Sequence, residues 1–235
     1  MRKSDLPTLL LVHGAWHRKE TWGKLINELP GIDVRTVQLP SSAPVPPERL
    51  GGLYDDAEVV RAAVDAIGRP YVVAAHSYGA VPVTQGLPGA ANLRRVVSIC
   101  GWLLDVGESL LSVIGGKPTE WMPEQEGGWY DMTSPREIFY ADLSEEDAAA
   151  AAATLGPTSV ASITETVTQA VWRTGVPVTA IYAKDEVMAP FFKNLAERAG
   201  DTVLSLPGSH SPFLSRPAEL AAILRNELEQ AAKEA

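Results

Sequence analysis

Short apolar runs recur along the chain, and each is followed by turn-forming residues. The six runs are rich in β-branched side chains and cover residues 8–12, 33–39, 71–75, 93–100, 176–183 and 201–206. Several are apolar on both faces, which is typical of parallel strands that are covered by helices on each side. We therefore predict one buried, mostly parallel sheet.

Helical patterns lie between these runs. In residues 18–29 the apolar side chains of Trp22, Leu25, Ile26 and Leu29 fall on one face of a helix. Similar patterns predict further helices over residues 55–67, 78–87, 189–199 and 216–233. Strands that alternate with helices at this spacing indicate an α/β fold, with a doubly wound, mostly parallel sheet flanked by helices.

The alternation stops at roughly residues 104–172. This span contains a potential hairpin that turns at Gly127 and Gly128, followed by the helical patterns "LSEEDAAAAAATLG" and "TSVASITETVTQAVW". We expect a single domain over residues 1–235, with residues 104–172 inserted in it as a lid above the carboxyl ends of the strands. The insertion is rich in aromatic residues, namely Trp121, Trp129, Phe139, Tyr140 and Trp172. For most of these we favour a simpler role, as a small core of the insertion itself.

Composition and charge limit the classes of function. The chain has 235 residues, 46% of them hydrophobic and 21% charged, with a formal net charge of −9. Its arginines and lysines are scattered singly, so no basic run could neutralise a phosphate backbone, and we expect no nucleic-acid partner. The single cysteine, Cys100, excludes an intrachain disulfide and a multi-cysteine metal site, and we expect it in the core.

Membrane attachment is also not expected. The N-terminal apolar run is short and is preceded by Asp5 and Pro7, unlike the core of a signal peptide. No run approaches the ~18 apolar residues that cross a bilayer. We therefore expect a cytoplasmic protein.

Polar residues follow four of the predicted strands. They are "HGAWH" (13–17), "HSYG" (76–79), "KDE" (184–186) and "GSHS" (208–211). In an open α/β sheet, ligands bind beyond the carboxyl ends of the strands. Ser77, Asp185 and His210 are therefore expected at one site, in the chain order serine, aspartate, histidine.

Ser77 lies where "YVVAAHSYGA" turns from a strand into a helix, as in the nucleophile elbow G-x-S-x-G. Ala75 replaces the first glycine of that motif. The strained backbone conformation belongs to the serine itself, and the flanking positions only need small side chains, which Ala75 and Gly79 supply. The alternative is that Ser77 caps the following helix.

At this point the chain resembles the α/β-hydrolase superfamily over nearly its whole length. Four stretches carry the resemblance in the right order: "LLLVHGAWH", "VVAAHSYGA", "IYAKDEVMAP" and "LPGSHSPFLSRP". The early "HGAW" and the stretch "REIFYADLSEEDAAAAAATL" are most similar to the small-esterase group that includes plant methylesterases and hydroxynitrile lyases. The resemblance implies the α/β-hydrolase fold and a catalytic triad.

The triad roles follow from the chemistry of serine. Its hydroxyl is a weak nucleophile, so a neutral imidazole must take the proton while a carboxylate orients that imidazole. We assign these roles to Ser77, His210 and Asp185, with Glu186 or Asp105 as alternatives for the acid.

Two backbone N–H groups bind the oxyanion in this family, and the resemblance implies that they belong to Ala15 and Tyr78. Gly14 would let that loop approach closely. Candidates for the pocket wall lie beside the motifs: Trp16, Tyr78, Trp102, Leu103, Val187 and Phe213.

The remaining histidines are expected to be structural. His13 and His76 lie inside motifs that act through their backbone, and His17 is expected at a helix start or at the pocket rim. No H-E-x-x-H motif is present, and Gly51-Gly52 follows no strand. We therefore expect no metal and no cofactor.

These expectations point to a serine hydrolase, a carboxylesterase, that cleaves a small, largely apolar ester such as a methyl ester or lactone. A hydroxynitrile-lyase-like or other lyase is an alternative, weakened because Gly14 and Ser211 stand where those lyases have a threonine and a lysine. A small-molecule receptor on the same fold is a second alternative. The sequence identifies neither the acyl and alcohol groups nor the oligomeric state.

Overall fold

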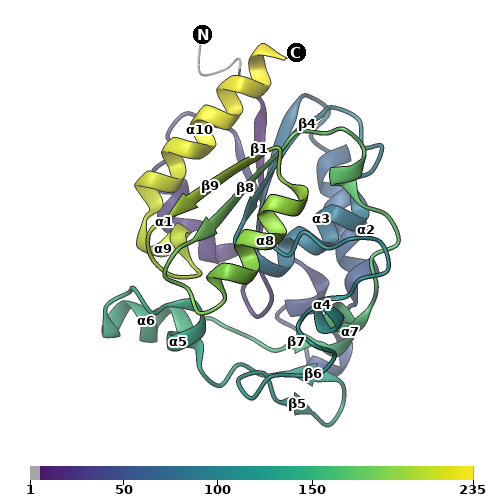
Figure 1. The fold of residues 1–235 in the computed structure, drawn as a ribbon, viewed down its shortest axis with the longest axis vertical. Helices are drawn as coiled ribbons and strands as arrows, with labels where there is room; N and C mark the ends of the chain where they lie inside the picture. Colours follow the sequence, from purple (N-terminus) through teal and green to yellow (C-terminus); the bar gives the residue numbers. More distant parts are fainter. Residues whose placement is uncertain (1–5, 235) are drawn as a thin grey trace.

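Six parallel strands form the central sheet, in the order β2-β1-β3-β4-β8-β9 (Figure 1). The computed structural model describes residues 6–234. The strands are β1 (Thr8–Val12), β2 (Val34–Val37), β3 (Tyr71–His76), β4 (Leu93–Ile99), β8 (Val178–Ala183) and β9 (Thr202–Leu206). Each coincides with a predicted strand to within three residues at either end, so the predicted fold class is confirmed.

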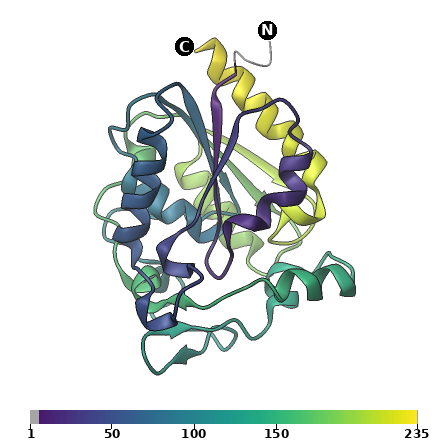
Figure 2. The ribbon, with the colours of Figure 1, turned by 180° about the vertical axis from the view of Figure 1, so that it is seen from behind.

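Helices cover both faces of this sheet, as Figures 1 and 2 show from opposite sides. One face packs on α1 (Gly23–Asn27), α9 (Pro212–Ser215) and α10 (Pro217–Lys233), and the other on α2 (Leu53–Asp65), α3 (Ala80–Gly86) and α8 (Ala189–Ala199). Alternate residues of β1 pack into the two hydrophobic cores on either face of the sheet. Leu9 and Leu11 face α1, α9 and α10, while Leu10 and Val12 face α2, α3 and α8. This is why the strands are apolar on both faces.

Short 3-10 helices account for most of the remaining regular structure around the sheet. They are η2 (Lys19–Trp22), η3 (Pro40–Ser42), η4 (Pro47–Arg49), η5 (Ser77–Gly79) and η6 (Val171–Arg173). Two of them begin predicted helices: η2 precedes α1, and η5 precedes α3. The helix predicted from residue 78 therefore starts with a tighter turn, directly at Ser77.

The insertion lies beyond the carboxyl ends of the strands, along the lower side of Figure 1. Its predicted hairpin is present as β5 (Glu124–Gln125) and β6 (Trp129–Tyr130), and the predicted helix after Ser144 is α6 (Glu145–Ala152). Two further short helices are α4 (Leu110–Val113) and α5 (Pro135–Phe139).

The stretch "TSVASITETVTQAVW" is less helical than predicted. It begins as a strand, β7 (Thr158–Ser159), that pairs with β6, then forms one short α-helix, α7 (Val160–Thr164), and ends in the 3-10 helix η6. The β-branched Thr158 suits a strand, and its pairing with Tyr130 is a tertiary contact that outweighs local helical periodicity.

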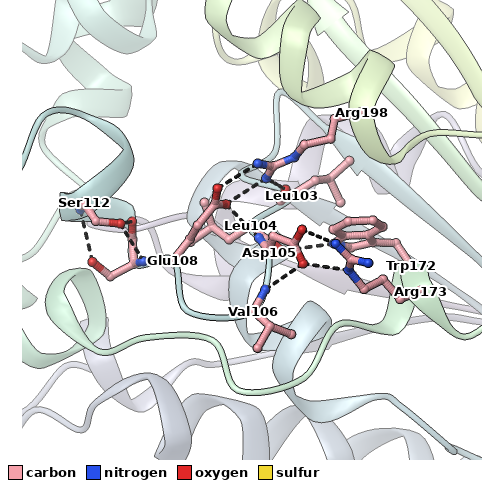
Figure 3. Close-up of polar contacts among 10 residues, drawn as sticks. Leu103, Leu104, Asp105, Val106, Glu108, Ser112, Trp172, Arg173 and Arg198 are labelled. Atoms are coloured by element: carbon pink, nitrogen blue, oxygen red, sulfur yellow. Dashed lines mark hydrogen bonds and ion pairs between the residues drawn. The ribbon is translucent and has the colours of Figure 1, made fainter.

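The two ends of the insertion are joined to each other and to α8 (Figure 3). Asp105 forms an ion pair with Arg173, and Trp172 donates a hydrogen bond from Nε1 to the carbonyl of Leu104 at 2.9 Å. Arg198 of α8 binds Glu108 at 2.8 Å. Because Asp105 is held by Arg173 here, it does not serve as the partner of His210.

Among residues 6–234, no helix combines the length and apolar character that crossing a membrane requires.

Candidate active site

Ser77 lies at the end of β3 with a left-handed backbone, φ 51°. This conformation is strained for a residue with a side chain, as the elbow requires. A Cβ atom added to Gly79 would lie 2.4 Å from the carbonyl oxygen of His13, so only glycine fits there. Ala75 is fully buried between the neighbouring strands. The predicted geometry of the elbow is therefore confirmed, and Ser77 lines a cavity.

The carboxylate that contacts His210 is Glu186. Its Oε2 lies 2.5 Å from Nδ1 of His210, and both side chains are buried. A carboxylate accepts, so Nδ1 carries the hydrogen, and in the neutral tautomer Nε2 has the lone pair that a general base needs. The assignment of this contact to Asp185 is wrong, and the alternative, Glu186, takes that position.

Asp185 instead joins two loops. Its Oδ2 accepts a hydrogen bond from the N–H of Gly208 at 2.7 Å, and its own N–H donates to the carbonyl of Gly208 at 3.1 Å. Gly208 precedes His210 by two residues, so Asp185 holds the loop that carries the imidazole. Two adjacent acids in a loop point in different directions, and their sequence does not reveal which one faces the histidine.

The other histidines are buried and hydrogen-bonded. His76 donates from Nε2 to the carbonyl of His210 at 2.8 Å, which fixes the backbone of that residue. His13 contacts the carbonyl of Gly14 at 2.9 Å. Burial lowers the pKa of His13 to about 4 and that of His76 well below its usual range, so both rings are neutral. Their predicted structural roles are confirmed.

His17 departs from the prediction. Only 2% of it is exposed, so it does not lie at a rim, and its Nε2 accepts from the hydroxyl of Tyr140 at 2.9 Å. Burial lowers its pKa to about 3.

The two predicted oxyanion donors, Ala15 and Tyr78, both line the cavity beside Ser77. The loop with Ala15 approaches so closely that a Cβ atom on Gly14 would lie 3.0 Å from Cβ of Ser77. Among residues 6–234, the N–H of Ala15 donates no hydrogen bond, so it is free to bind a ligand.

Tyr78 is anchored by its side chain. Its hydroxyl donates to Oδ2 of Asp56 at 2.7 Å, and Oδ1 of Asp56 accepts from the N–H of Ser41 at 2.9 Å. Burial raises the pKa of Asp56 from 3.8 to about 7 despite these donors, because a desolvated carboxylate is costly.

The cavity has a volume of ≈ 50 Å³, and its wall is mostly apolar. Trp16, Trp102 and Val187 line it as predicted. Leu103 and Phe213 do not: both are fully buried in the core, and Phe213 packs on Trp22 with ring centroids 4.8 Å apart. Sequence reasoning missed several apolar lining residues, namely Leu110, Trp121, Ile138, Phe139, Met188 and Phe192.

The insertion supplies four of these missed residues. Trp121 and Phe139 pack on Trp16 with centroids 6.0 and 5.9 Å apart, so they complete the pocket instead of forming a separate core. Phe139 also stacks on the ring of His210, at 5.6 Å. The aromatic content of the insertion was the only sequence signal for these contacts.

One group within residues 6–234 has the residue types of a metal site. Cys100, Glu186 and His210 each bring one potential ligand atom, and these atoms lie within 4.8 Å of one another. Burial, and then the charge of Glu186, raises the pKa of the Cys100 thiol well above its usual range. A cation bound there would have to displace the thiol proton and separate Glu186 from His210. The arrangement therefore suits a hydrogen-bonded acid–base pair with a thiol behind it.

Comparison with known proteins agrees with this geometry. Residues 9–223 match the alpha/beta hydrolase family. A curated relative, the probable hydrolase R7 of Phoma sp. (strain ATCC 20986 / MF5453), is 30% identical over 236 residues, covering 93% of this chain and 96% of that protein. The chain thus belongs to the alpha/beta hydrolase family, and the family and this relative support a hydrolase.

Solved structures show the same fold at low sequence identity. A pyrethroid hydrolase from Sphingobium faniae JZ-2 is 19% identical, with a TM-score of 0.81 and coverage of 97% of this chain and 99% of that one. The methylesterase MES16 from Arabidopsis is 16% identical, with a TM-score of 0.77 and coverage of 95% and 99%. Polyneuridine aldehyde esterase is 19% identical, with a TM-score of 0.79 and coverage of 94% and 99%. At these identities the likeness shows that the chain shares the fold of these esterases and hydrolases.

Proposed function

We propose that the protein hydrolyses small, largely apolar carboxylic esters through an acyl-enzyme on Ser77. The observation that carries this proposal is the buried pair of His210 and Glu186, 2.5 Å apart, in the same cavity as a serine with a strained backbone. This pair leaves Nε2 of His210 as a base, and Glu186 replaces Asp185 as the acid of the triad.

In the proposed reaction, Nε2 of His210 removes the hydroxyl proton as Ser77 attacks the ester carbonyl. The oxyanion that forms is bound by the N–H groups of Ala15 and Tyr78, and Glu186 stabilises the imidazolium. His210 then gives the proton to the departing alcohol. Water, activated by the same imidazole, cleaves the acyl-enzyme and restores Ser77.

The lining of the cavity supports the substrate class. Among the described lining residues there is no lysine or arginine, and the acidic Glu186 is engaged by His210. An anionic substrate would therefore lose its hydration without gaining a charged partner. Trp102 and Phe192, with centroids 5.0 Å apart, form an aromatic wall that suits an apolar group.

We further propose that the insertion, residues 104–172, is the lid of this pocket. Leu110, Trp121, Ile138 and Phe139 place apolar side chains over Ser77 from that segment. Excluding water strengthens the electrostatic interactions on which the oxyanion depends. A small-molecule ester is the proposed partner.

The test combines fluorophosphonate labelling with hydrolysis of p-nitrophenyl esters of short and long acyl chains. Wild type should be labelled and active, and Ser77→Ala should lose both. Ser144→Ala, which alters the exposed serine that caps α6, should keep both. Activity that survives Ser77→Ala would refute the serine-hydrolase mechanism, whereas labelling without turnover of any ester would favour a receptor or a lyase.

A histidine general base acts only as the neutral imidazole, so the mechanism requires a pH-dependent rate. A flat profile of kcat/KM from about pH 5 to about pH 9 would contradict a histidine base.

A further inference from the structure

The loop that carries Ala15 is held by a hydrogen-bond network that uses three successive carbonyl groups. The carbonyl of Gly14 contacts Nδ1 of His13 at 2.9 Å and accepts from the N–H of His17 at 3.3 Å. The carbonyl of Ala15 contacts Nδ1 of His17 at 2.9 Å. The carbonyl of Trp16 accepts from the N–H of Gly156 at 2.9 Å.

The insertion provides the outer part of this network. Trp16, whose backbone is left-handed with φ 62°, donates from its indole nitrogen to the carbonyl of Tyr130 at 2.9 Å. Tyr140 donates its hydroxyl hydrogen to Nε2 of His17 at 2.9 Å. Together with Gly156, three residues of the insertion therefore bind a strained loop of the sheet domain.

The neutral state of His17 determines which atom donates and which accepts in each of its two side-chain hydrogen bonds. Because burial keeps the ring neutral, one ring nitrogen donates and the other accepts. A carbonyl oxygen can only accept, so Nδ1 of His17 carries the hydrogen and donates to Ala15. Its Nε2 then accepts from Tyr140, which leaves every polar atom of the ring satisfied.

The Gly14–Ala15 peptide is held at its own carbonyl by the ring of His13 and the N–H of His17, and the side chain of His17 holds the carbonyl of the next peptide. The N–H of Ala15 and the carbonyl of Gly14 belong to the same peptide, so they point in opposite directions. A glycine at position 14 allows this peptide to rotate easily. If it flipped, a carbonyl oxygen would face the developing oxyanion and repel it.

We propose that this network keeps the N–H of Ala15 directed into the pocket, and that His17 and Tyr140 are positioning residues of the oxyanion hole. The inference rests on the proposed function, since it concerns the same site. The insertion then has a second role besides covering the pocket, because it stabilises the catalytic conformation of the Gly14–Ala15 peptide.

The main variant is His17→Leu, which keeps bulk but removes the donor to Ala15. Its kcat on p-nitrophenyl butyrate should fall by up to about 10²–10³-fold, the loss expected for one oxyanion donor, with little change in KM. His17→Asn should recover most of that loss, because its side-chain amide nitrogen can replace Nδ1. A loss that asparagine does not recover would contradict the proposed hydrogen bond.

A milder variant, Tyr140→Phe, removes one oxygen atom and keeps the test valid if His17→Leu does not fold. Its kcat should fall about two- to tenfold, as for one lost hydrogen bond. The matched control is Tyr54→Phe, which removes a tyrosine hydroxyl that binds the insertion elsewhere, at the carbonyl of Thr166, and should leave kcat unchanged. Equal rates for Tyr140→Phe and wild type would refute the role of Tyr140.

A further measurement separates positioning from general damage. Affinity for a trifluoromethyl ketone, whose adduct carries an oxyanion, should fall in the His17 and Tyr140 variants by the same factor as kcat/KM. Inhibition by 1-butanol, a neutral ligand that carries no oxyanion, should stay constant, and equal weakening of both ligands would overturn the inference. Activity in Ser77→Ala would instead remove the proposed function itself, so the two failures can be distinguished.

Discussion

The two sides of the pocket are built differently. On the nucleophile side, the loops after β1 and β3 meet at the centre of the sheet, so closely that Gly14 and Gly79 have no room for a Cβ atom. On the acid–base side, the loops after β8 and β9 lie at the edge of the sheet, and Val187 in the first of them is 71% exposed. Backbone geometry defines the first side, whereas the direction of long side chains defines the second.

This difference explains which predictions succeeded. A backbone that needs small residues leaves a pattern in the sequence, and "HSYG" indicates the strained turn that Ser77 has. A side-chain contact from a loop leaves only a residue type, and "KDE" offered two acids. The comparison therefore predicts that substitutions of the small residues on the nucleophile side act through packing, and that substitutions of the two acids on the other side act through hydrogen bonds.

The largest effect is expected at Ala75. It is fully buried, so Ala75→Leu would place three extra carbon atoms between strand and helix and should abolish folding or activity. Ala75→Gly should be mild, because it restores the commoner elbow residue. Soluble yield and kcat/KM of both variants test this, and full activity of Ala75→Leu would show that the elbow is wrongly assigned.

On the acid–base side, Glu186→Gln should lower kcat/KM by about 10³–10⁴-fold, because it removes the charge that orients the imidazole and stabilises the imidazolium. The matched substitution, Asp185→Asn, should cost less than about tenfold in rate, since it alters one hydrogen bond to Gly208. Steady-state kinetics on p-nitrophenyl butyrate compares them. The reverse order of effects would restore Asp185 as the acid.

Gly14→Ala tests the nucleophile side at the oxyanion loop. The added methyl group would lie 2.9 Å from Nδ1 of His76, so the loop must retreat, with an expected loss in kcat of about 10²–10³-fold. Gly23→Ala is the control, because a Cβ atom there meets no neighbour within 4 Å. If both variants kept wild-type kcat, close approach of this loop would not matter for catalysis.

Asp56, which anchors Tyr78, should affect the pH dependence of stability. Its pKa is raised from 3.8 to about 7 on folding, so between these values the folded state binds more protons than the unfolded state. Its contribution to the free energy of unfolding is thus complete below about pH 4 and is lost as pH rises towards 7.

Asp56→Asn should remove this contribution. The difference in stability between wild type and variant should change between pH 4 and 7 in favour of the variant, as measured by urea unfolding. The depressed pKa of His17 acts in the opposite direction, with stability lost as pH falls towards 3, so the difference curve and not the wild-type curve is diagnostic. A pH-independent difference would mean that Asp56 is ionised throughout.

The smallest effect is expected at Val187. Because it is mostly exposed at the edge of the pocket, Val187→Ser should change kcat/KM by less than about threefold. Phe192→Leu, which reduces a buried ring of the same pocket, should cost more. A larger loss at Val187 would show that this residue becomes buried when substrate binds.

The sequence by itself determined the sheet, its flanking helices and the position of Ser77 and His210. The spacing of apolar residues reflects which of them are buried. Polar residues that directly follow parallel strands lie together at one edge of the sheet, so both features can be recognised along the chain. Even the missing glycine of the elbow was interpretable, because Ala75 is small enough.

Only the tertiary structure decided the contacts between segments that are far apart in the chain. It selected Glu186 over Asp185, moved Phe213 and Leu103 from the pocket wall to the core, and brought Trp121 and Phe139 onto Trp16. It also revealed His17 as a link between the insertion and the loop of Ala15. The physical reason is that a local pattern records how a residue is buried, whereas a hydrogen bond across the molecule depends on where two distant backbones place their side chains.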